Sequence, residues 1–508
     1  MAVLLLGDQL HPDRGPVADA DRVVMVEAWE FARRRAYHPH KLVLVFAAMR
    51  HARDRLRERG VAVDYYEADT FGEGLDAHFA AYPGDDLVTM RPASHGAADR
   101  LRALVTARGG TLRVVENDLF LCSRERWDDY AGDAEPPYRQ EQFYRTMRRE
   151  TGYLMADGDP VGGEWNYDDE NRETPGEDYE PPDPPRYEPD SVTEAVIERV
   201  GAMDGSYDTD PPGPGWADPD PFFWPVTRDE ALDALDRFVE ERLAEFGPYQ
   251  DAMLAGERSM NHALLSGAMN VGLLAPDEVI EAVIDGAREQ PETPLNSVEG
   301  FVRQVLGWRE FIRHCYREAM PELADANQLD QTEPLPEFYW TGETEMACMS
   351  DVVGGVRERG YSHHIERLMV LSNFALTYGV DPSELNEWFH AGYVDAYHWV
   401  TTPNVVEMGS FGAGVFATKP YASSANYVNR MSDYCSGCPY YHTKASGEGS
   451  CPFNALYWDF LDRNEERLRE TGRMGLVYSH LDDKHGEELD TIRERADEVR
   501  AMAESGDL

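Results

Sequence analysis

Apolar residues in the first 120 positions form short runs that alternate with stretches of helical periodicity. The runs predict strands, and "AMRHARDRLRERG" between two of them predicts a helix. The predicted strands cover residues 3–6, 23–27, 42–46, 61–66, 87–90 and 112–115. Strands that alternate with helices indicate a parallel, Rossmann-like sheet with helices on both faces. We therefore expect an α/β domain over residues 1–130, with any ligand beyond the carboxyl ends of its strands.

Proline and acidic residues interrupt this pattern. "DDENRETPGEDYEPPDPPRYEPD" and "DPPGPGWADPDPFFWP" show little apolar periodicity, which predicts an interdomain linker over residues 131–225 that lies on the surface. From residue 226 apolar residues recur three and four positions apart, as in "DEALDALDRFVEERLAEFG". We expect an all-α domain over residues 226–508. Its charged end, "DKHGEELDTIRERADEVRAMAESGDL", is interpreted as a terminal helix outside the core.

Composition adds an unusual charge balance to this picture. The chain has 508 residues, 95 of them acidic and 48 basic, for a net charge of −47. Only four of the basic residues are lysines: Lys41, Lys419, Lys444 and Lys484. Because periodic apolar segments run almost throughout, the chain is not a disordered acidic protein. The acidity is instead typical of a halophilic protein, in which concentrated salt screens the self-repulsion.

The sequence shows no pattern of a signal peptide, a membrane span or a common nucleotide-binding loop. The start, "MAVLLLGDQLHPD", is interpreted as a first strand and not a signal peptide. No apolar run approaches the roughly 18 residues of a membrane span. Six cysteines in 508 residues do not form a disulfide framework, so we expect a cytoplasmic monomer without a membrane partner. There is no GxGxxG and no GxxxxGK[ST] loop.

Three cysteines lie close together in "SDYCSGCPYYHTKASGEGSCPF": Cys435, Cys438 and Cys451. Both zinc and an iron–sulfur cluster accept a CxxC followed by a third thiolate. The fourth ligand could be Cys348, Cys315 or His442. A lone distant cysteine that completes such a set is typical of [4Fe–4S] sites. Cys122 and Cys315 stand among apolar or aromatic residues and are interpreted as core thiols.

Several helical segments resemble the flavin domain of cryptochromes and photolyases. These segments are "QVLGWREFIR", "RSMNHALLSGAMNVGLL", "HHIERLMVLSNFAL" and "WFHAGYVDAYHWVTTPNVVEMGSFG". Together with Cys348, Cys435, Cys438 and Cys451 they resemble the iron–sulfur bacterial cryptochromes and photolyases, also called prokaryotic (6-4) photolyases. The resemblance covers nearly the whole chain.

This resemblance implies a set of cofactors and a substrate. The family implies FAD in the helical domain, a [4Fe–4S] cluster on the four cysteines, and a ribolumazine antenna (6,7-dimethyl-8-ribityllumazine) in the α/β domain. It also implies light-driven repair of (6-4) photoproducts in UV-damaged DNA. Two other hypotheses remain: a blue-light photoreceptor with the same cofactors and no repair activity, and a nucleic-acid-binding module in which the metal cluster only stabilises the fold.

The resemblance also assigns residues around the flavin. His364 is implied as the acid that assists repair, with His363 beside it, since histidine can donate a proton near neutral pH. On a helix these consecutive side chains point about 100° apart, so only one faces a given pocket. Arg367 and Asp395 match a family pair near flavin N5. Further implied flavin contacts are Tyr249, Asn261, Leu265, Ser266, Asn270, Gln304 and Arg309. Thr401 stands where many photolyases carry an amide.

Aromatic residues and the antenna complete the implied site. Trp340 and Trp388 match positions for photoreduction, and Phe389 stands where a tyrosine would offer a further oxidisable step. Tyr421 and Tyr427 resemble family tyrosines near the lesion and the metal cluster, and Tyr427 or Trp399 could serve another electron relay. The implied antenna contacts are Asp8, Gln9, Met49 and Arg50, with Glu27 and Tyr37 as weaker candidates.

Contact with DNA must be reconciled with the net charge of −47. Phosphate contacts ordinarily need a basic surface. Residues 401–458 contain three acidic residues (Glu407, Asp433, Glu448) and three basic ones (Lys419, Arg430, Lys444). This local relief of acidity favours residues 401–458 as the DNA-facing segment.

Overall fold

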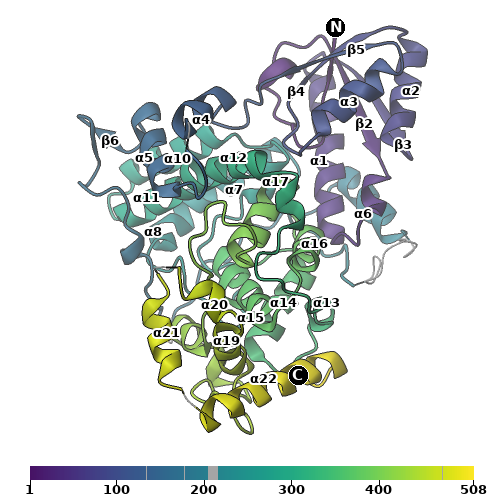
Figure 1. The fold of residues 1–508 in the computed structure, drawn as a ribbon. Helices are drawn as coiled ribbons and strands as arrows, with labels where there is room; N and C mark the ends of the chain where they lie inside the picture. The colour runs from purple at the N-terminus through teal and green to yellow at the C-terminus, as the bar shows by residue number, and fades with distance from the viewer. Residues whose placement is uncertain (133, 177, 204–215, 472, 485) are drawn as a thin grey trace.

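A five-stranded parallel sheet organises the N-terminal part of the protein. The computed structural model describes residues 1–508 except 133, 177, 204–215, 472 and 485. The strands are β1 (Ala2–Leu4), β2 (Arg22–Ala28), β3 (Ala62–Ala68), β4 (Asp86–Met90) and β5 (Thr111–Val115). Their order is β3-β2-β1-β4-β5, and every pairing is parallel (Figure 1). The predicted Rossmann-like sheet is confirmed.

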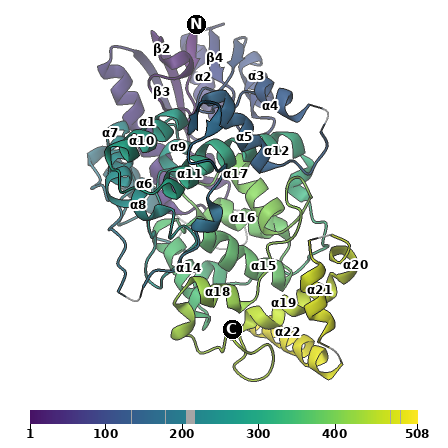
Figure 2. The same ribbon diagram turned by 90° about the vertical axis from the view of Figure 1, so that its left-hand side faces the viewer.

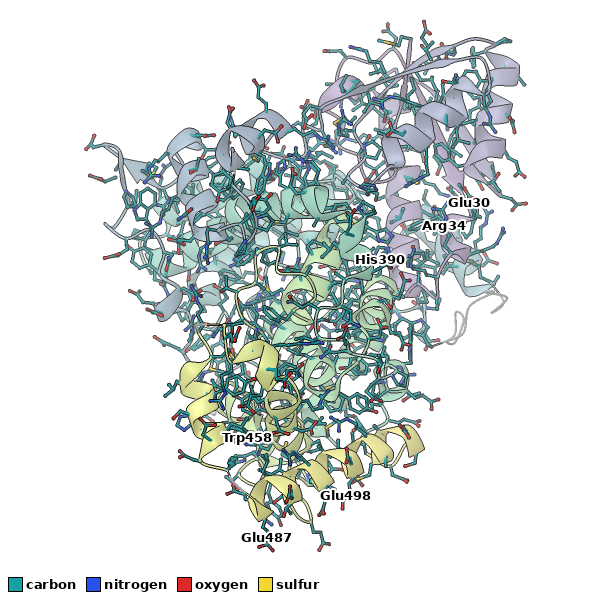
Figure 3. All side chains as sticks on the ribbon, viewed as in Figure 1. Glu30, Arg34, His390, Trp458, Glu487 and Glu498 are labelled. Carbon is teal, nitrogen blue, oxygen red and sulfur yellow. The ribbon has the colours of Figure 1, made fainter. Side chains whose placement is uncertain are left out.

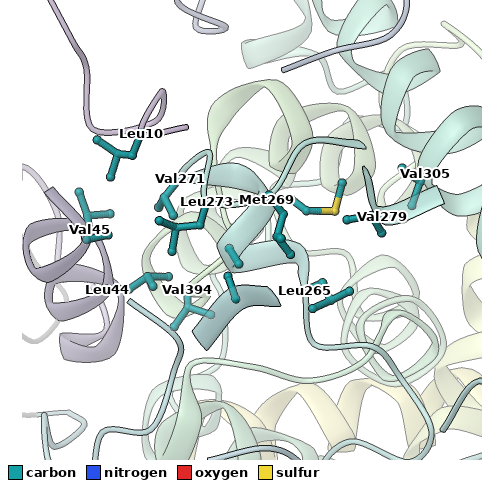
Figure 4. Close-up of a cluster of buried hydrophobic side chains, with 14 of the residues drawn as sticks. Leu10, Leu44, Val45, Leu265, Met269, Val271, Leu273, Val279, Val305 and Val394 are labelled. Atoms are coloured by element: carbon teal, nitrogen blue, oxygen red, sulfur yellow. The ribbon is translucent and has the colours of Figure 1, made fainter. Parts of the chain in front are cut away.

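One predicted strand is wrong. Residues 42–46 belong to α1 (Pro39–Glu58), which begins with Pro39 in its first turn and with the His38 ring accepting the His40 N–H. The run is apolar on every side because α1 is covered by β3, by α6 (Ser191–Gly201) and by the helical part of the chain. Figure 4 shows Leu44 and Val45 facing Leu273 and its neighbours. A helix buried all round cannot be told from a buried strand by periodicity.

The remaining elements of the N-terminal part are short. Two helices flank the sheet: α2 (Phe71–Ala81) packs on β2 and β3, and α3 (Ala97–Thr106) packs on β5. Thr70 and Glu73 form a capping box that begins α2. Helices α4 (Arg124–Ala131) and α5 (Gln140–Thr151) and a small hairpin, β6 (Met155–Ala156) with β7 (Asp159–Pro160), follow.

The proline-rich segment is anchored and does not simply lie on the surface. Helix α6 packs on α1, and the side chains of Trp216, Phe222 and Trp224 are at most 5% exposed. The indole N–H groups of both tryptophans donate to backbone carbonyls, Trp216 to Ala36 and Trp224 to Arg359. The aromatic end of this segment is therefore part of the core. The proposed domain limits, 1–130, 131–225 and 226–508, stay a prediction.

The rest of the described chain is helical, as expected. The helices are α7 (Arg228–Arg237), α8 (Leu243–Phe246), α9 (Ser266–Asn270), α10 (Pro276–Glu289), α11 (Leu295–Val302), α12 (Glu310–Ala319), α13 (Phe338–Thr341), α14 (Ala347–Arg359), α15 (Asn373–Tyr378), α16 (Pro382–Gly392), α17 (His398–Thr402), α18 (Ala425–Met431), α19 (Pro452–Arg463), α20 (Glu465–Leu468), α21 (Gly475–Asp482) and α22 (Glu487–Ser505). Figure 2 shows α19 to α22 gathered at the end of the molecule opposite the sheet. No described helix is long and apolar enough to cross a membrane.

The terminal helix α22 is part of the core, so the expectation that it adds nothing to the core is wrong. Ile492, Ala496, Val499 and Ala503 form a stripe at helical spacing, and none is more than 6% exposed. This stripe packs against α19, while Glu487 and Glu498 point outward (Figure 3). The stripe is narrow and half alanine, which is why the charged residues around it dominate the sequence pattern.

A buried lysine joins the sheet domain to the helices. Lys41 of α1 is 1% exposed, and its Nζ donates to the carbonyls of His390 (2.9 Å) and Ala396 (2.5 Å). The ammonium also lies 4.7 Å from the centre of the Tyr37 ring. Burial lowers the pKa of Lys41 from 10.5 to about 7. One of only four lysines in the chain thus fixes the sheet domain to the helices.

We predict that this lysine makes stability depend on pH. Between pH 7 and 10.5 the unfolded chain binds a proton that folded Lys41 does not, so the free energy of unfolding rises with pH across that window. Lys41→Met abolishes the rise and leaves two carbonyls unpaired. The stability gap between wild type and variant should widen by up to about 1.4 kcal/mol per pH unit. Denaturant midpoints at pH 7.5 and 9 measure it.

The control is Lys484→Met, because Lys484 pairs with Glu488 in an exposed position. Its midpoint should follow that of the wild type at both pH values. A Lys41→Met gap that stays constant with pH would contradict the titration of Lys41.

Candidate functional site

Asp395 is the meeting point of the predicted flavin residues. It lies between α16 and α17, and Arg367 of the π-helical segment η7 (Glu366–Ser372) donates to both carboxylate oxygens at 3.1 and 3.0 Å. Ser266 Oγ of α9 donates to Oδ2 at 2.7 Å, and Asn270 Nδ2 donates to the Asp395 carbonyl at 2.8 Å. The structure therefore brings three predicted residues to Asp395: two bind its buried carboxylate and one binds its backbone carbonyl. A bidentate, charge-assisted pair of this kind fixes both side chains.

Arg309 extends this arrangement toward the sheet domain. It ends a second π-helical segment, η5 (Arg303–Arg309), which also carries Gln304, and its Nη2 lies 3.5 Å from Asn270 Oδ1. Its guanidinium lies over the rings of Phe120 and Trp399, at 4.3 and 4.9 Å from their centres. Burial lowers the pKa of Arg309 to about 10. Both basic residues of the predicted flavin site thus lie on π-helical segments, which are frequent at functional sites.

A second group of predicted residues lies in the loop before α9. Leu265 is buried, and Asn261 Nδ2 donates to the hydroxyl of Tyr179, whose ring contacts Tyr249 at 4.7 Å. Two non-glycine residues of this loop, Met260 and Leu264, have positive φ angles of 44° and 59°. Such backbone is typical of a loop shaped around a ligand.

Buried polar atoms in and beside this loop fit a ligand that carries anionic and hydroxyl groups. Arg242 is 1% exposed, and although its Nη2 donates to Ser259 Oγ, its Nε and Nη1 have no partner among the described residues. The buried Oδ1 of Asn261 and Nε2 of His262 are likewise without a partner in the described chain. Buried polar groups ordinarily find partners. Guanidinium donors beside this loop fit the diphosphate and ribityl groups of FAD.

Three histidines, here called the histidine group, contact one another beside Arg367. His262 stacks on His363 with ring centres 4.6 Å apart and meets the His364 ring edge-on at 5.2 Å. One ring nitrogen from each lies within 4.8 Å of the others. The two consecutive histidines diverge as expected: the His363 side chain is fully buried, and that of His364 is 45% exposed.

Carboxylates hold both consecutive histidines. Asp251 lies 3.3 Å from His364 Nε2, and Glu366 lies 3.4 Å from His363 Nε2 while accepting the His363 backbone N–H. Burial, and the neighbouring histidines after it, lower the pKa of His262 well below its usual range, so His262 is neutral. Only His364 combines exposure with a carboxylate partner. Sequence reasoning missed His262 and Asp251; His262 stood in the segment already matched to the flavin phosphates.

One predicted lesion tyrosine, Tyr427, lies near the carboxylate partner of His364. Burial and the nearby Asp251 carboxylate raise the pKa of Tyr427, and the Arg430 guanidinium lies 5.5 Å from its ring centre. Asp251 is therefore close to both Tyr427 and His364. Tyr421 is 37% exposed and, like Tyr427, lies near Asp168.

Trp388 contacts Tyr339, the residue that precedes Trp340 in the chain. The Trp388 indole N–H donates to the Tyr339 carbonyl at 2.9 Å, and the Trp388 and Tyr339 rings meet at 5.1 Å. On its other side Trp388 meets Tyr393 at 5.8 Å, and Arg367 lies 4.2 Å from the Tyr393 ring centre. Trp388 is thereby connected to the Arg367–Asp395 pair. Tyr393 stacks on Phe389 at 5.1 Å.

The predicted antenna residues lie in the α/β region but are not all available to a ligand. Gln9 is 1% exposed, with its amide donating to the Met90 carbonyl. Arg50 donates to both oxygens of buried Glu27. These side chains are committed to bonds inside the α/β region. Burial raises the pKa of Asp8 to about 6, and Met49 lies against Gly7. An antenna contact at Asp8 and Met49 stays a prediction.

Four cysteines from two distant segments line one cavity. Cys348 lies in the first turn of α14, Cys435 and Cys438 lie in the loop after α18, and Cys451 caps α19. Burial, and then the three other thiols, raise the pKa of Cys348. Burial also raises the pKa of Cys435 to about 11 and that of Cys451 to about 12. Cys122 and Cys315 are buried elsewhere, as expected for core thiols.

Four sulfurs that line one cavity suit a metal centre. Both a zinc ion and an iron–sulfur cluster accept four thiolates, so the identity of the metal stays a prediction.

Comparison with known proteins identifies the family. Residues 3–207 match the family model of the deoxyribodipyrimidine photo-lyase-related proteins. Over 490 residues the chain is 39% identical to the (6-4) photolyase of Agrobacterium fabrum, with 94% of each chain covered. The chain belongs to the photolyase family. This confirms the resemblance found in the sequence, and membership in the photolyase family implies FAD as cofactor.

Solved structures with the photolyase fold match the whole chain. A bacterial class III photolyase from Agrobacterium tumefaciens gives a TM-score of 0.59 at 16% identity, with 99% of this chain and 98% of that chain covered. A cryptochrome of Synechocystis gives a TM-score of 0.53 at 13% identity, covering 85% of this chain and 88% of the other. The predicted combination of an α/β domain and a helical flavin domain is confirmed.

We predict that the Asp395 carboxylate is required for flavin retention. Asp395→Asn keeps the shape of the side chain but leaves Arg367 without its charged partner. The variant should lose FAD during gel filtration, measured as flavin absorbance per protein. Asp459→Asn is the matched control, because Asp459 is also buried and paired with arginines, in α19. Equal flavin content in both variants would count against the site.

Proposed function

We propose that this photolyase family member repairs (6-4) pyrimidine–pyrimidone photoproducts in UV-damaged DNA under blue light. The single observation that carries the proposal is His364: a half-exposed imidazole held by Asp251 and one helical turn before Arg367. The relative that shares 39% identity over nearly all of both chains is named a (6-4) photolyase, which supports the same lesion class. Action as a monomer in the cytoplasm belongs to the same proposal.

Bound FAD would supply one electron to the lesion under blue light. The chain's own residues would hold the reaction in place. Arg367 and Asp395 fix each other beside the flavin pocket, and Arg242 offers unpaired guanidinium donors to the cofactor's phosphates. The carboxylate of Asp251 holds the His364 imidazole in place, and this imidazole would protonate a group on the lesion. His363, buried and held by Glu366, keeps the backbone before His364 in place.

The four cysteines would hold a [4Fe–4S] cluster that connects α14 to the loop before α19. The shared cavity, lined by cysteines from two distant segments, supports this cofactor. Each thiol must lose its proton to bind iron. Binding to the metal then offsets the free-energy cost of burying four sulfur groups together. A 6,7-dimethyl-8-ribityllumazine antenna near Asp8 and Met49 completes the proposed cofactor set.

DNA would approach the face that carries Tyr421, Tyr427 and Arg430. Residues 401–458 are poor in acids, and two of the four lysines, Lys419 and Lys444, lie in this segment. Tyr441 is 57% exposed, and the Lys444 ammonium lies 4.2 Å from its ring centre. An exposed aromatic ring beside a cation suits contact with unstacked bases and phosphates.

We predict that Cys348→Ser loses the iron. The variant keeps only three cysteines at the site. Cys122 and Cys315 are buried elsewhere and cannot supply the fourth thiolate. Iron and sulfide per protein, together with visible absorbance, provide the measurement. Cys315→Ser, which alters another fully buried thiol, should keep its iron. Full iron in Cys348→Ser, with loss in Cys315→Ser, would overturn the ligand assignment.

We predict that His364→Ala keeps FAD, iron and photoreduction but loses repair by about 100- to 10,000-fold, the usual cost of removing a positioned acid. A (6-4) oligonucleotide under blue light tests both this residue and the proposed function. His363→Ala, which alters the buried neighbour, should be milder. Wild-type protein that reduces its flavin but repairs no oligonucleotide would favour the photoreceptor hypothesis. Repair by His364→Ala at the wild-type rate would assign the acid to another group.

A further inference from the structure

A third tryptophan contacts the outer end of the Trp388–Trp340 series. Trp216, from the proline-rich segment, meets the Trp340 ring edge-on with centres 5.4 Å apart and an interplanar angle of 86°. The two rings are 5% and 8% exposed. Neither the sequence pattern nor the family comparison assigns any role to Trp216.

The contact is held by bonds on both sides. The Trp216 indole N–H donates to the Ala36 carbonyl at 3.0 Å, and the Trp216 carbonyl accepts from Arg357 Nε at 3.1 Å. Arg357 Nη1 also donates to the carbonyl of Thr341, the residue after Trp340. One arginine of α14 thus fixes both tryptophan segments. These hydrogen bonds fix the edge-on arrangement of the two indole rings.

Inward from this contact, the backbone joins Trp340 to the aromatic rings beside the flavin pocket. Trp340 follows Tyr339 in the chain, and Tyr339 meets Trp388 both ring to ring and through the bond from the Trp388 indole N–H. Trp388 meets Tyr393, over which Arg367 lies. Three side chains, Tyr393, Trp388 and Tyr339, therefore lead from the Arg367–Asp395 pair to the segment of Trp340, and Trp216 adds an indole, an easily oxidised ring, beyond it.

We propose that Trp216 is the outermost electron donor of this series, an inference that rests on the proposed function. When light excites the bound flavin, one electron passes to it from Trp388. Trp340 then refills Trp388, and Trp216 refills Trp340. A thiol reductant in solution returns one electron to Trp216, so two such cycles oxidise two thiols to one disulfide. No bond of the protein breaks: the Trp216 indole nitrogen keeps its proton, hydrogen-bonded to the Ala36 carbonyl, and the two thiol protons pass to the solvent.

Trp216 has a neutral imidazole and the charged guanidinium of Arg357 among its neighbours. The nearest other ring is that of His38, edge-on at 5.3 Å. Burial lowers the pKa of His38 well below its usual range, so this imidazole is neutral and does not repel an oxidised indole. A hole on Trp216 also lies one ring farther from the flavin than a hole on Trp340. That separation slows the return of the electron.

The test compares Trp216→Phe with Trp224→Phe in the FAD-loaded protein. Trp224 comes from the same segment, is equally buried, and also donates its indole N–H to a carbonyl, but it contacts Phe223 and Tyr361 instead of Trp340. After a blue flash, Trp216→Phe should lose the long-lived tryptophan-radical absorbance and reduce its flavin more slowly with dithiothreitol. Trp224→Phe should behave as wild type. Flavin content, iron content and melting temperature are recorded for each.

A double variant separates electron transfer from packing. If Trp216 acts through Trp340, Trp216→Phe with Trp340→Phe photoreduces no worse than Trp340→Phe alone. The proposal is overturned if the double variant photoreduces more slowly than Trp340→Phe alone, or if Trp216→Phe keeps the radical lifetime of the wild type. It is also overturned if only Trp224→Phe loses the long-lived radical. Protein reduced beforehand with dithionite should repair a (6-4) oligonucleotide equally well with or without Trp216. Absence of repair in both would refute the proposed function and leave the electron series intact.

Discussion

The fold around the flavin pocket depends on how residues 395 and 396 are held. The Asp395 carboxylate is almost fully buried, and a buried charge is tolerated only when it is paired. Arg367 and Ser266 supply the partners, which draws η7 and α9 to the same point. The next carbonyl, that of Ala396, accepts from Lys41 of α1. Three segments far apart in the chain, including one from the sheet domain, are thus fixed by two adjacent residues.

Much of this arrangement could be predicted because local patterns carry it. Alternating apolar runs gave the parallel sheet, and the Arg367–Asp395 pairing followed from the family motifs. The prediction failed where burial comes from tertiary packing: residues 42–46 are apolar because other elements surround α1 on every side. It failed again at α22, where a stripe with two alanines is enough to pack against α19.

The site contacts that the sequence did not reveal all come from distant segments. His262 meets His363 and His364 across a separation of about a hundred residues, and no periodicity records such a contact. The contact of Tyr339 with Trp388 was also not predictable. Tyr339 precedes Trp340 in the chain, but a neighbouring residue can turn its ring toward a different helix. In contrast, Cys435, Cys438 and Cys451 were predictable as a group from their spacing, and Cys348 was added by the family motifs.

The terminal helix bears on the order in which the protein is assembled. Arg495 of α22 is buried and donates to Ser450 Oγ at 3.1 Å, immediately before Cys451. The ribosome makes α22 after all four cysteines, so the Cys451 segment gains this support only late in synthesis. Until then Ser450 and its neighbour lack a brace that the finished protein has. Stable packing of the Cys451 segment is therefore a late step of biogenesis, and a nascent chain stalled before residue 487 would lack it.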